Sequence, residues 1–212
     1  MKRSLRAAMR SQRSQDAPTI GSAQATQAAR QVAALLAQAI DWAGARCVAL
    51  YAGVGNELDT APIADLARRC GATTCYPRIV QKTPPLLAFH VVRDGSELQT
   101  ASFGLLEPPT TAARTDHIDL FVIPGLAFDR AGRRLGLGRG FYDAALRAHP
   151  EALRVAVGHP FQLVPEVPTE AHDEPVDLVA TSTGCLRTSA RGQHPLVRQA
   201  LPVAQATTED VS

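Results

Sequence analysis

The sequence predicts a single-domain α/β fold in which a mostly parallel central sheet is flanked by helices. Short apolar runs recur along the chain and alternate with helical or loop stretches, as in proteins built from strand–helix–strand units. The chain is also long enough, at 212 residues, to bury roughly 70% of its unfolded surface. One core of this size needs neither disulfides nor a structural metal.

Helical periodicity and capping residues define the expected helices. Apolar residues repeat at helical spacing over residues 25–40, after the capping candidate Ser22. A second helix is expected from Thr60, a plausible N-cap, to about Cys70, with Pro62 in its first turn. A third is expected over residues 141–148. The expected strands are residues 47–52, 73–76, 86–92, 118–123, 153–157 and 178–181.

Composition limits the classes of protein to consider. No apolar run reaches the roughly 18 residues of a membrane helix, and the first 16 residues contain no apolar stretch typical of a signal peptide. A net charge of +2 and 5% aromatic residues disfavour a nucleic-acid binder. We expect a cytoplasmic monomer that acts on a small molecule, with a domain over residues 1–181. Residues 182–212, rich in Ser, Thr, Gln, Pro and Ala, are expected to form a peripheral or disordered tail.

The cysteines and histidines show no metal-ligand spacing. The four cysteines, Cys47, Cys70, Cys75 and Cys185, do not form paired short spacings. We therefore interpret them as reduced core residues, with a regulatory disulfide as the exception.

A glycine-rich loop follows the expected strand 118–123. Gly136, Gly138 and Gly140 alternate with other residues just before the helix at 141–148, and Arg134 and Arg139 flank them. Glycine backbone amides, a helix N-terminus and guanidinium groups all favour phosphate oxygens. The spacing matches neither a dinucleotide-binding fingerprint nor a P-loop. Phosphate binding is the favoured interpretation, and a flexible Gly/Arg surface loop is the alternative.

The N-terminus is strongly basic. Lys2, Arg6, Arg10 and Arg13 fall on one stripe if the segment is helical. Three interpretations stay open from the residues alone: a solvated or phosphate-binding arm, a membrane-surface helix, and a transit peptide. With the basic residues of the glycine loop, this stripe would concentrate positive charge that the small net charge conceals.

Several segments, in order along the chain, resemble those of the 5-formyltetrahydrofolate cyclo-ligase family, also called methenyltetrahydrofolate synthetase. The most specific is residues 119–143, where P-G-L-A-F-D, R-L-G-x-G-x-G and F-Y-D follow one another. The other matching segments are residues 2–6, 56–60, 76–78, 104–108, 172–173 and 177–181. The resemblance covers residues 2–181, makes the transit-peptide interpretation less attractive, and implies an α/β cyclo-ligase domain.

The resemblance implies an enzyme that uses ATP and Mg²⁺ to close 5-formyltetrahydrofolate into 5,10-methenyltetrahydrofolate, releasing ADP and phosphate. A formamide oxygen is a poor leaving group, so ATP would first phosphorylate it, and the neighbouring amine would then displace phosphate. Such a reaction depends on positioning and charge stabilisation. The alternative from another class is a non-catalytic nucleotide- or RNA-binding protein that uses the basic helix and the Gly/Arg loop.

The resemblance also implies roles for individual residues. Arg134, Arg139 and Tyr142 would be catalytic, and Asp143 would assist Mg²⁺. Ala52, Glu57 and Tyr142 would bind the folate, with the Glu57 carboxylate on the amino-pyrimidone edge of the pterin. The residues expected to bind ATP are Lys2, Arg6, Arg134, Leu135, Gly136, Leu137, Gly138, Arg139, Gly140, Phe141 and Tyr142.

Overall fold

The structure is a computed structural model that describes residues 1–101, 104–189, 191 and 193–199. Its α-helices are α1 (Lys2–Asp16), α2 (Ala23–Ala39), α3 (Ala61–Arg69) and α4 (Phe141–Ala148). The strands of its main sheet are β1 (Cys47–Ala49), β2 (Thr73–Gln81), β3 (Leu86–Val91), β6 (Arg114–Thr115), β7 (Leu120–Ile123), β10 (Leu153–Val157), β11 (Leu178–Thr181) and β12 (Gly184–Arg187).

The main sheet is mostly parallel, which confirms the predicted fold class. Its strand order is β12-β11-β10-β7-β1-β2-β3-β6, and every pair from β11 to β2 is parallel. Strands β12, β3 and β6 join antiparallel at the two edges. Strands β1, β7 and β10 are buried throughout and apolar except for Arg154, as expected for strands covered on both faces. Two short ribbons complete the strands: β4 (Gln99–Thr100) with β5 (Leu106–Glu107), and β8 (Ala127–Phe128) with β9 (Arg134–Leu135).

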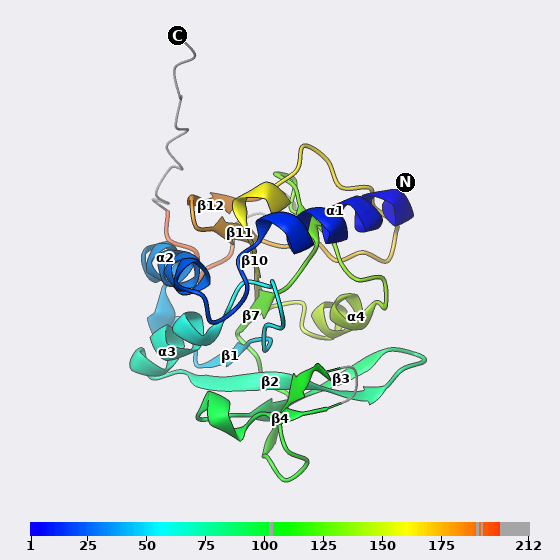
Figure 1. The fold of residues 1–212 in the computed structure, drawn as a ribbon. Helices are drawn as coiled ribbons and strands as arrows, with labels where there is room; N and C mark the ends of the chain where they lie inside the picture. Colours follow the sequence, from blue (N-terminus) through cyan, green and yellow to red (C-terminus); the bar gives the residue numbers. More distant parts are fainter. Residues whose placement is uncertain (102–103, 190, 192, 200–212) are drawn as a thin grey trace.

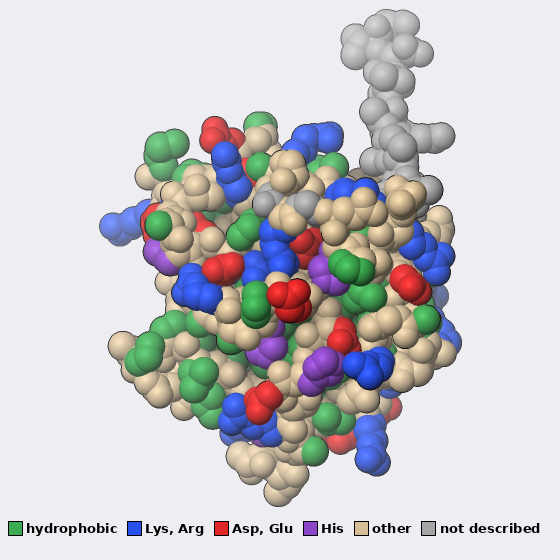
Figure 2. Space-filling view, turned by 180° about the vertical axis from the view of Figure 1, so that it is seen from behind, with side chains coloured by type: hydrophobic (Ala, Val, Ile, Leu, Met, Phe, Trp, Pro, Cys, Tyr) green, Lys and Arg blue, Asp and Glu red, His purple; other side chains and the backbone are tan. Residues whose placement is uncertain are grey.

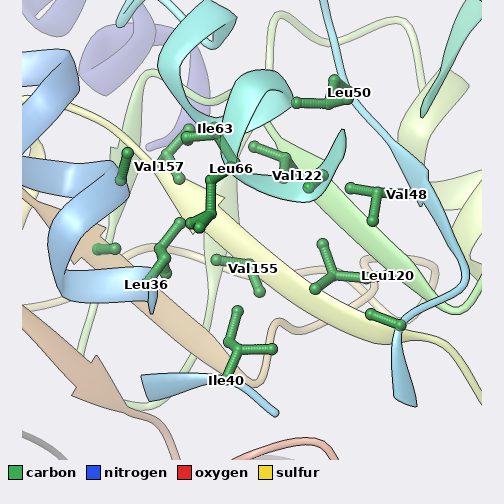
Figure 3. Packing of buried hydrophobic residues seen from close by; sticks show 14 of the residues in the cluster. Leu36, Ile40, Val48, Leu50, Ile63, Leu66, Leu120, Val122, Val155 and Val157 are labelled. Atoms are coloured by element: carbon green, nitrogen blue, oxygen red, sulfur yellow. The ribbon is translucent and has the colours of Figure 1, made fainter. Parts of the chain in front are cut away.

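Alternate residues of the strands build two cores, one on each face of the sheet. Leu120, Val122 and Val155 pack with Leu36 of α2 and Ile63 of α3 (Figure 3). On the opposite face, one of the partners of the sheet is α4, whose Ala145 and Leu146 are buried. Figure 1 shows α2 and α3 on one side of the strands and α4 on the other. A three-layer arrangement follows from the period-two alternation of the strands.

The predicted helices form close to their expected bounds. Ser22 caps α2, since its hydroxyl accepts a hydrogen bond from the amide of Ala25 at 3.2 Å. Thr60 stands at the N-cap of α3, but its hydroxyl donates to the carbonyl of Tyr51 instead. The Asp59 carboxylate accepts from the amide of Ala61 and takes over the capping role.

Helix α1 lies outside these layers and rests on the segment that follows β7 (Figure 1). Met9 is its one buried residue in the described structure, and it packs against Leu126, Leu135 and Val167. Leu5 packs partly buried against the same cluster, and ion pairs and hydrogen bonds from the basic side chains of the helix add to this packing. No helix among the described residues is long and apolar enough to span a membrane.

The expected tail at 182–212 is wrong for its first part. Strand β12 pairs with β11 at the sheet edge, and Val197 is 4% exposed within the core beside α2. The amide of Asp41 donates to the carbonyl of Leu196, and Ile40 forms a β-bridge with Val197. Two short apolar stretches within a polar composition were enough to form these contacts. Residues 190, 192 and 200–212 lie outside the described residues.

The four cysteines are free in the structure, but not all of them are core residues, contrary to the expectation from the sequence. Cys47, Cys75 and Cys185 are buried, whereas Cys70 is exposed just after α3. Apolar packing accounts for the first three, and Cys70 lies where the helix ends at the surface.

Candidate active site

Loops from the carboxyl ends of the parallel strands meet beneath α1. The loop after β1 carries Glu57, and the segment after β7 carries the glycine loop. The loop after β10 carries residues 170–174. Ligands of open α/β sheets bind at this edge. Hydrogen bonds and ion pairs from α1 reach all three loops.

Arg134 is a buried guanidinium at the centre of this arrangement. It lies in β9, which pairs with β8, and the intervening turn is held by Asp129, whose carboxylate accepts from the amides of Ala131 and Arg133. Arg134 is 7% exposed and its Nη2 donates to Asp143 Oδ1 at 2.8 Å. Its Nε is buried without a hydrogen-bond partner among the described residues. The guanidinium is therefore fixed at one end and has a free donor.

Tyr142 lies beneath the Arg134 guanidinium, whose carbon is 5.8 Å from the centre of the phenol ring. Burial raises the pKa of Tyr142, the negative charge of Glu57 raises it further, and Arg134 opposes both effects. The phenol therefore stays protonated and can donate a hydrogen bond. Glu57 lies in the loop after β1 and Arg134 lies in β9, and Tyr142 lies within electrostatic reach of both.

The glycine loop needs glycine for two separate reasons. Gly138 and Gly140 have φ angles of +92° and +70°, in the left-handed region that favours glycine. A Cβ on Gly136 would lie 2.8 Å from Nη1 of Arg134, so a side chain there would displace the guanidinium. Gly140 is the N-cap of α4. The loop thus brings backbone amides and a helix N-terminus close to Arg134.

The other residues of the predicted phosphate loop separate into buried and exposed groups. Leu135 is 1% exposed and packs against Met9, so its side chain is a core contact and cannot touch a ligand. Leu137 and Arg139 are exposed, and Phe141 is half-buried at the start of α4. Only the backbone of Leu135 can contribute to a phosphate site.

The basic stripe of α1 faces the site. Lys2 Nζ donates to Asp173 Oδ2 at 2.6 Å and lies 3.4 Å from Glu170. Arg6 Nε donates to the carbonyl of Gly136 at 3.1 Å. Further along the helix, Arg10 reaches the carbonyl of Leu137 at 3.5 Å. The two basic segments of the sequence therefore converge in space.

Arg13 and Glu57 close the other end of the stripe with an ion pair of 3.2 Å. Glu57 Oε2 also accepts from the amide of Val54 at 3.3 Å, which orients the carboxylate. Ala52, another predicted folate residue, lies half-buried at the start of the same loop and packs against the core. The pairing of Arg13 with Glu57 was not expected. The sequence shows four basic residues on one stripe and does not indicate which of them meets an acidic side chain.

Acidic side chains beside the loop could take part in holding a cation. Asp143 Oδ1 accepts from Arg134 and from the amide of Glu174, whereas no hydrogen bond to its Oδ2 is found among the described residues. Asp173 precedes Glu174 and faces Lys2. No group of three or more His, Cys, Asp or Glu side chains forms a metal site in the described parts of the chain. Carboxylates such as that of Asp143 are the protein ligands that Mg²⁺ prefers, usually one or two together with phosphate oxygens and several waters.

His159 supports the loop after β1, which carries Glu57, and nothing in the sequence indicated this contact. It is 4% exposed, stacks on Phe161 and places Nε2 3.2 Å from the carbonyl of Asn56. Burial lowers the pKa of His159, so the neutral ring donates its Nε2 hydrogen to that carbonyl. No spacing in the sequence connects residues 56 and 159, and only the packing brings them together.

Comparison with known proteins gives one family. The model of the 5-formyltetrahydrofolate cyclo-ligase family matches residues 1–182. The chain is 36% identical over 143 residues to a 5-formyltetrahydrofolate cyclo-ligase of Mycolicibacterium smegmatis, covering 64% of this chain and 73% of that one. It is 32% identical over 142 residues to the protein of the same name from Escherichia coli K12, with coverages of 65% and 78%.

Two solved structures extend the comparison to the fold. The 5,10-methenyltetrahydrofolate synthetase of Aquifex aeolicus matches with a TM-score of 0.71 and 26% identity, over 88% of this chain and 92% of that one. The synthetase of Mycoplasma pneumoniae matches with a TM-score of 0.65 over 85% and 98%, and at 17% identity it supports the fold alone. The chain therefore belongs to the 5-formyltetrahydrofolate cyclo-ligase family, a family of enzymes.

Proposed function

We propose that this protein cyclises 5-formyltetrahydrofolate to 5,10-methenyltetrahydrofolate with ATP, through a phosphorylated formyl oxygen, and releases ADP and phosphate. The observation that carries the proposal is the contact of Arg6 with Gly136, because it joins the basic helix to the glycine loop. Two cationic segments that meet beside the backbone amides of a glycine loop fit a triphosphate.

The first step transfers the γ-phosphoryl group of ATP to the formyl oxygen, and the bond between the γ-phosphorus and the bridging oxygen breaks. Lys2, Arg6 and the amides of residues 136–140 would hold the triphosphate in line with that oxygen. Arg134 and Arg139 would stabilise the charge on the transferred group, and Arg134 Nε offers a donor. Positioning and charge stabilisation are the main contributions that a protein makes to such a transfer.

In the second step the neighbouring amine nitrogen of the folate attacks the formyl carbon, and the carbon–oxygen bond to phosphate breaks. Glu57 would hold the amino-pyrimidone edge of the pterin, and the protonated Tyr142 would donate toward the reacting formyl group. Asp143 would assist Mg²⁺ beside Arg134. Bound Mg²⁺ would neutralise phosphate charge, as it does in other phosphoryl transfers.

Substrate binding must rearrange the ion pairs of the site. Lys2, which would hold phosphate, is paired with Asp173. Glu57, which would hold the pterin, is paired with Arg13. A bound triphosphate would compete for Lys2, and the pterin would compete for Glu57. These pairs therefore keep buried charges neutralised until the substrates replace them.

The direct test is an absorbance assay with purified protein, Mg·ATP and 5-formyltetrahydrofolate. The absorbance of the methenyl product should rise together with release of one ADP per product. Arg139→Ala should abolish most of the rise, whereas Arg30→Ala, which changes an exposed arginine of α2, should leave it intact. No rise with active folate and intact fold would exclude the proposed reaction.

The non-catalytic RNA-binding alternative predicts a different behaviour. It requires steeply salt-dependent RNA binding without ATP turnover. Lys2 and Arg13 are paired with acids of the same chain, and Figure 2 shows acidic and basic side chains interspersed over the face that it presents. Neither observation favours an extended nucleic-acid surface. We also propose a cytoplasmic location, supported by four free cysteines.

A further inference from the structure

Two cysteines lie side by side at the amino ends of neighbouring parallel strands. Cys47 begins β1, Cys75 lies in β2, and their Sγ atoms are 3.9 Å apart. Both belong to the core on the α4 side of the sheet. Glu57 and the glycine loop follow the carboxyl ends of β1 and β7. Cys47 begins β1 and therefore lies at the opposite end of that strand. The proposed reaction makes no use of the two thiols.

A surface pocket gives access to one of the two thiols. The pocket has a volume of about 400 Å³ and is lined by Arg46, Cys47, Thr73, Thr115 and His117. Cys47 is 6% exposed and Cys75 is 0% exposed. A small reagent in the pocket therefore meets Cys47 first and reaches Cys75 only through it.

Hydrogen bonding makes Cys47 the thiol that ionises first. The hydrogen bond from Cys75 lowers the pKa of Cys47, burial opposes this effect, and the Thr115 hydroxyl adds to the lowering. The nearby Asp119 carboxylate acts in the opposite direction, and one of its oxygens lies 2.9 Å from Nε2 of His117. The same sulfur contact and complete burial raise the pKa of Cys75. The two directions favour Cys47 as the attacking thiol and Cys75 as the thiol that resolves the product.

We propose that Cys47 and Cys75 form a modification site that hydroperoxides oxidise to a disulfide. The Cys47 thiolate attacks the terminal oxygen of the hydroperoxide, the O–O bond breaks, and the alcohol or water leaves after taking up a proton. Cys47 is then a sulfenic acid. The Cys75 sulfur attacks the Cys47 sulfur, the S–O bond breaks, and water leaves with the Cys75 proton. Two thiols are oxidised to one disulfide, and one hydroperoxide is reduced.

The disulfide requires a local adjustment of the sheet. The strand register pairs Cys47 with Thr73 and Ala49 with Cys75, so the two cysteines face each other on a diagonal. To reach a bond length of about 2.05 Å, the sulfurs must approach each other by roughly 1.9 Å from their present 3.9 Å. Strands β1 and β2 must therefore shift. A disulfide formed under such constraint is readily reduced by small thiols.

Peptide mapping of the native full-length chain tests the proposal. The protein is treated with hydrogen peroxide, quenched in acid, alkylated and digested, and thiols are located by mass spectrometry. The expected product is a peptide pair linked by Cys47 and Cys75 that disappears after treatment with glutathione. The exposed Cys70 is the internal control for an ordinary thiol. The proposal is overturned if Cys70 is oxidised while Cys47 and Cys75 both stay alkylatable, or if the linked pair contains Cys70.

Substitutions distinguish the attacking thiol, Cys47, from the thiol that completes the disulfide, Cys75. In Cys75→Ser the sulfenic acid has no thiol to resolve it, so a dimedone adduct should accumulate at Cys47. Cys70→Ser should leave the Cys47–Cys75 link unchanged. Circular dichroism before oxidation confirms the fold of each variant. Cys75→Ser is the informative variant, because its hydroxyl can still donate a hydrogen bond to Cys47. A folded Cys75→Ser variant without an adduct at Cys47 would contradict the assignment of Cys47 as the attacking thiol.

Discussion

Arg13 donates from Nη1 to Glu57 Oε1 at 3.2 Å, so the carboxylate expected to bind the pterin is already paired within the chain. Both side chains are largely shielded, with 19% and 12% of their surface exposed. The same carboxylate accepts a backbone hydrogen bond from Val54. Glu57 is therefore oriented and charge-balanced before folate arrives, and the pterin has to replace Arg13 as its partner.

Glu57→Gln tests the pterin role of this carboxylate. We expect the KM for folate to rise about tenfold, since the loss of one charge-assisted hydrogen bond costs about 1.5 kcal/mol or more. The KM for ATP should stay unchanged. Arg13→Ala should not raise the folate KM, because it removes a competitor for the carboxylate. Steady-state kinetics distinguish the two outcomes, with the exposed Glu151→Gln as the control. Equal increases in both variants would mean that the pair is only structural.

Arg134→Ala and Arg139→Ala should both lower turnover, but only Arg134→Ala should strongly lower the stability of the protein. Arg134→Ala leaves Asp143 without its buried partner, and we expect about 3 kcal/mol of lost stability. Arg139 is exposed, so Arg139→Ala should change the free energy of unfolding by about 0.5 kcal/mol or less. The sequence placed both residues beside the glycines of a loop, whereas the structure buries Arg134 in β9.

Urea unfolding and turnover measurements on the same samples check this pair. We expect kcat to fall about 100-fold in each variant, the usual loss when one stabilising donor is removed from a transition state. Arg134→Lys keeps the charge but loses the forked geometry, so its activity should recover only in part. Full activity in folded Arg134→Ala would exclude a role in phosphoryl transfer.

Gly138→Ala and Gly71→Ala form a matched pair. Both glycines have positive φ angles, +92° and +84°, so alanine should cost each about 1–2 kcal/mol. A Cβ at Gly138 would also lie 3.3 Å from the Arg6 guanidinium, whereas nothing lies within 4 Å of one at Gly71. We expect the KM for ATP to rise only in Gly138→Ala. Thermal melts and ATP kinetics test this, and a similar ATP KM for both variants would argue against the phosphate loop.

The ion pair of Lys2 with Asp173 should stabilise α1 in a pH-dependent way. Burial of Asp173 opposes its ionisation, but hydrogen bonds from Lys2 and from the Glu170 amide outweigh it, and the pKa of Asp173 is lowered. A lowered pKa contributes stability above the ordinary Asp value of about 3.9, and this stability is lost as the pH falls through the folded-state value.

Asp173→Asn should therefore have a Tm about 1–2 °C lower than the native chain at pH 7, as expected for a partly exposed ion pair. The difference should disappear when the pH falls below the lowered pKa of Asp173. Differential scanning calorimetry from pH 7 to acid provides the measurement. A Tm difference that persists in strong acid would show that packing, and not the charge of Asp173, docks the helix.

The repeating patterns of the sequence predicted the secondary structure because they depend on near neighbours. Strands β10 and β11 and helix α4 have their expected bounds, and Ser22 caps α2 as predicted. The same local reasoning failed at β12 and at Val197, where polar composition suggested a tail. Burial there depends on the exposed edge of β11 and on α2, and neither lies near those residues in the sequence.

By itself, the sequence determined the α/β class, the glycine loop and the concentration of cations in two segments, since periodicity, glycine spacing and charge are local properties. Only the tertiary structure decided which acid meets which cation, that Leu135 is buried, and that two cysteines touch. Lys2 meets Asp173 across 171 residues, and Cys47 meets Cys75 across 28. Such pairs depend on strand order and register, which are set by packing the whole chain into one core.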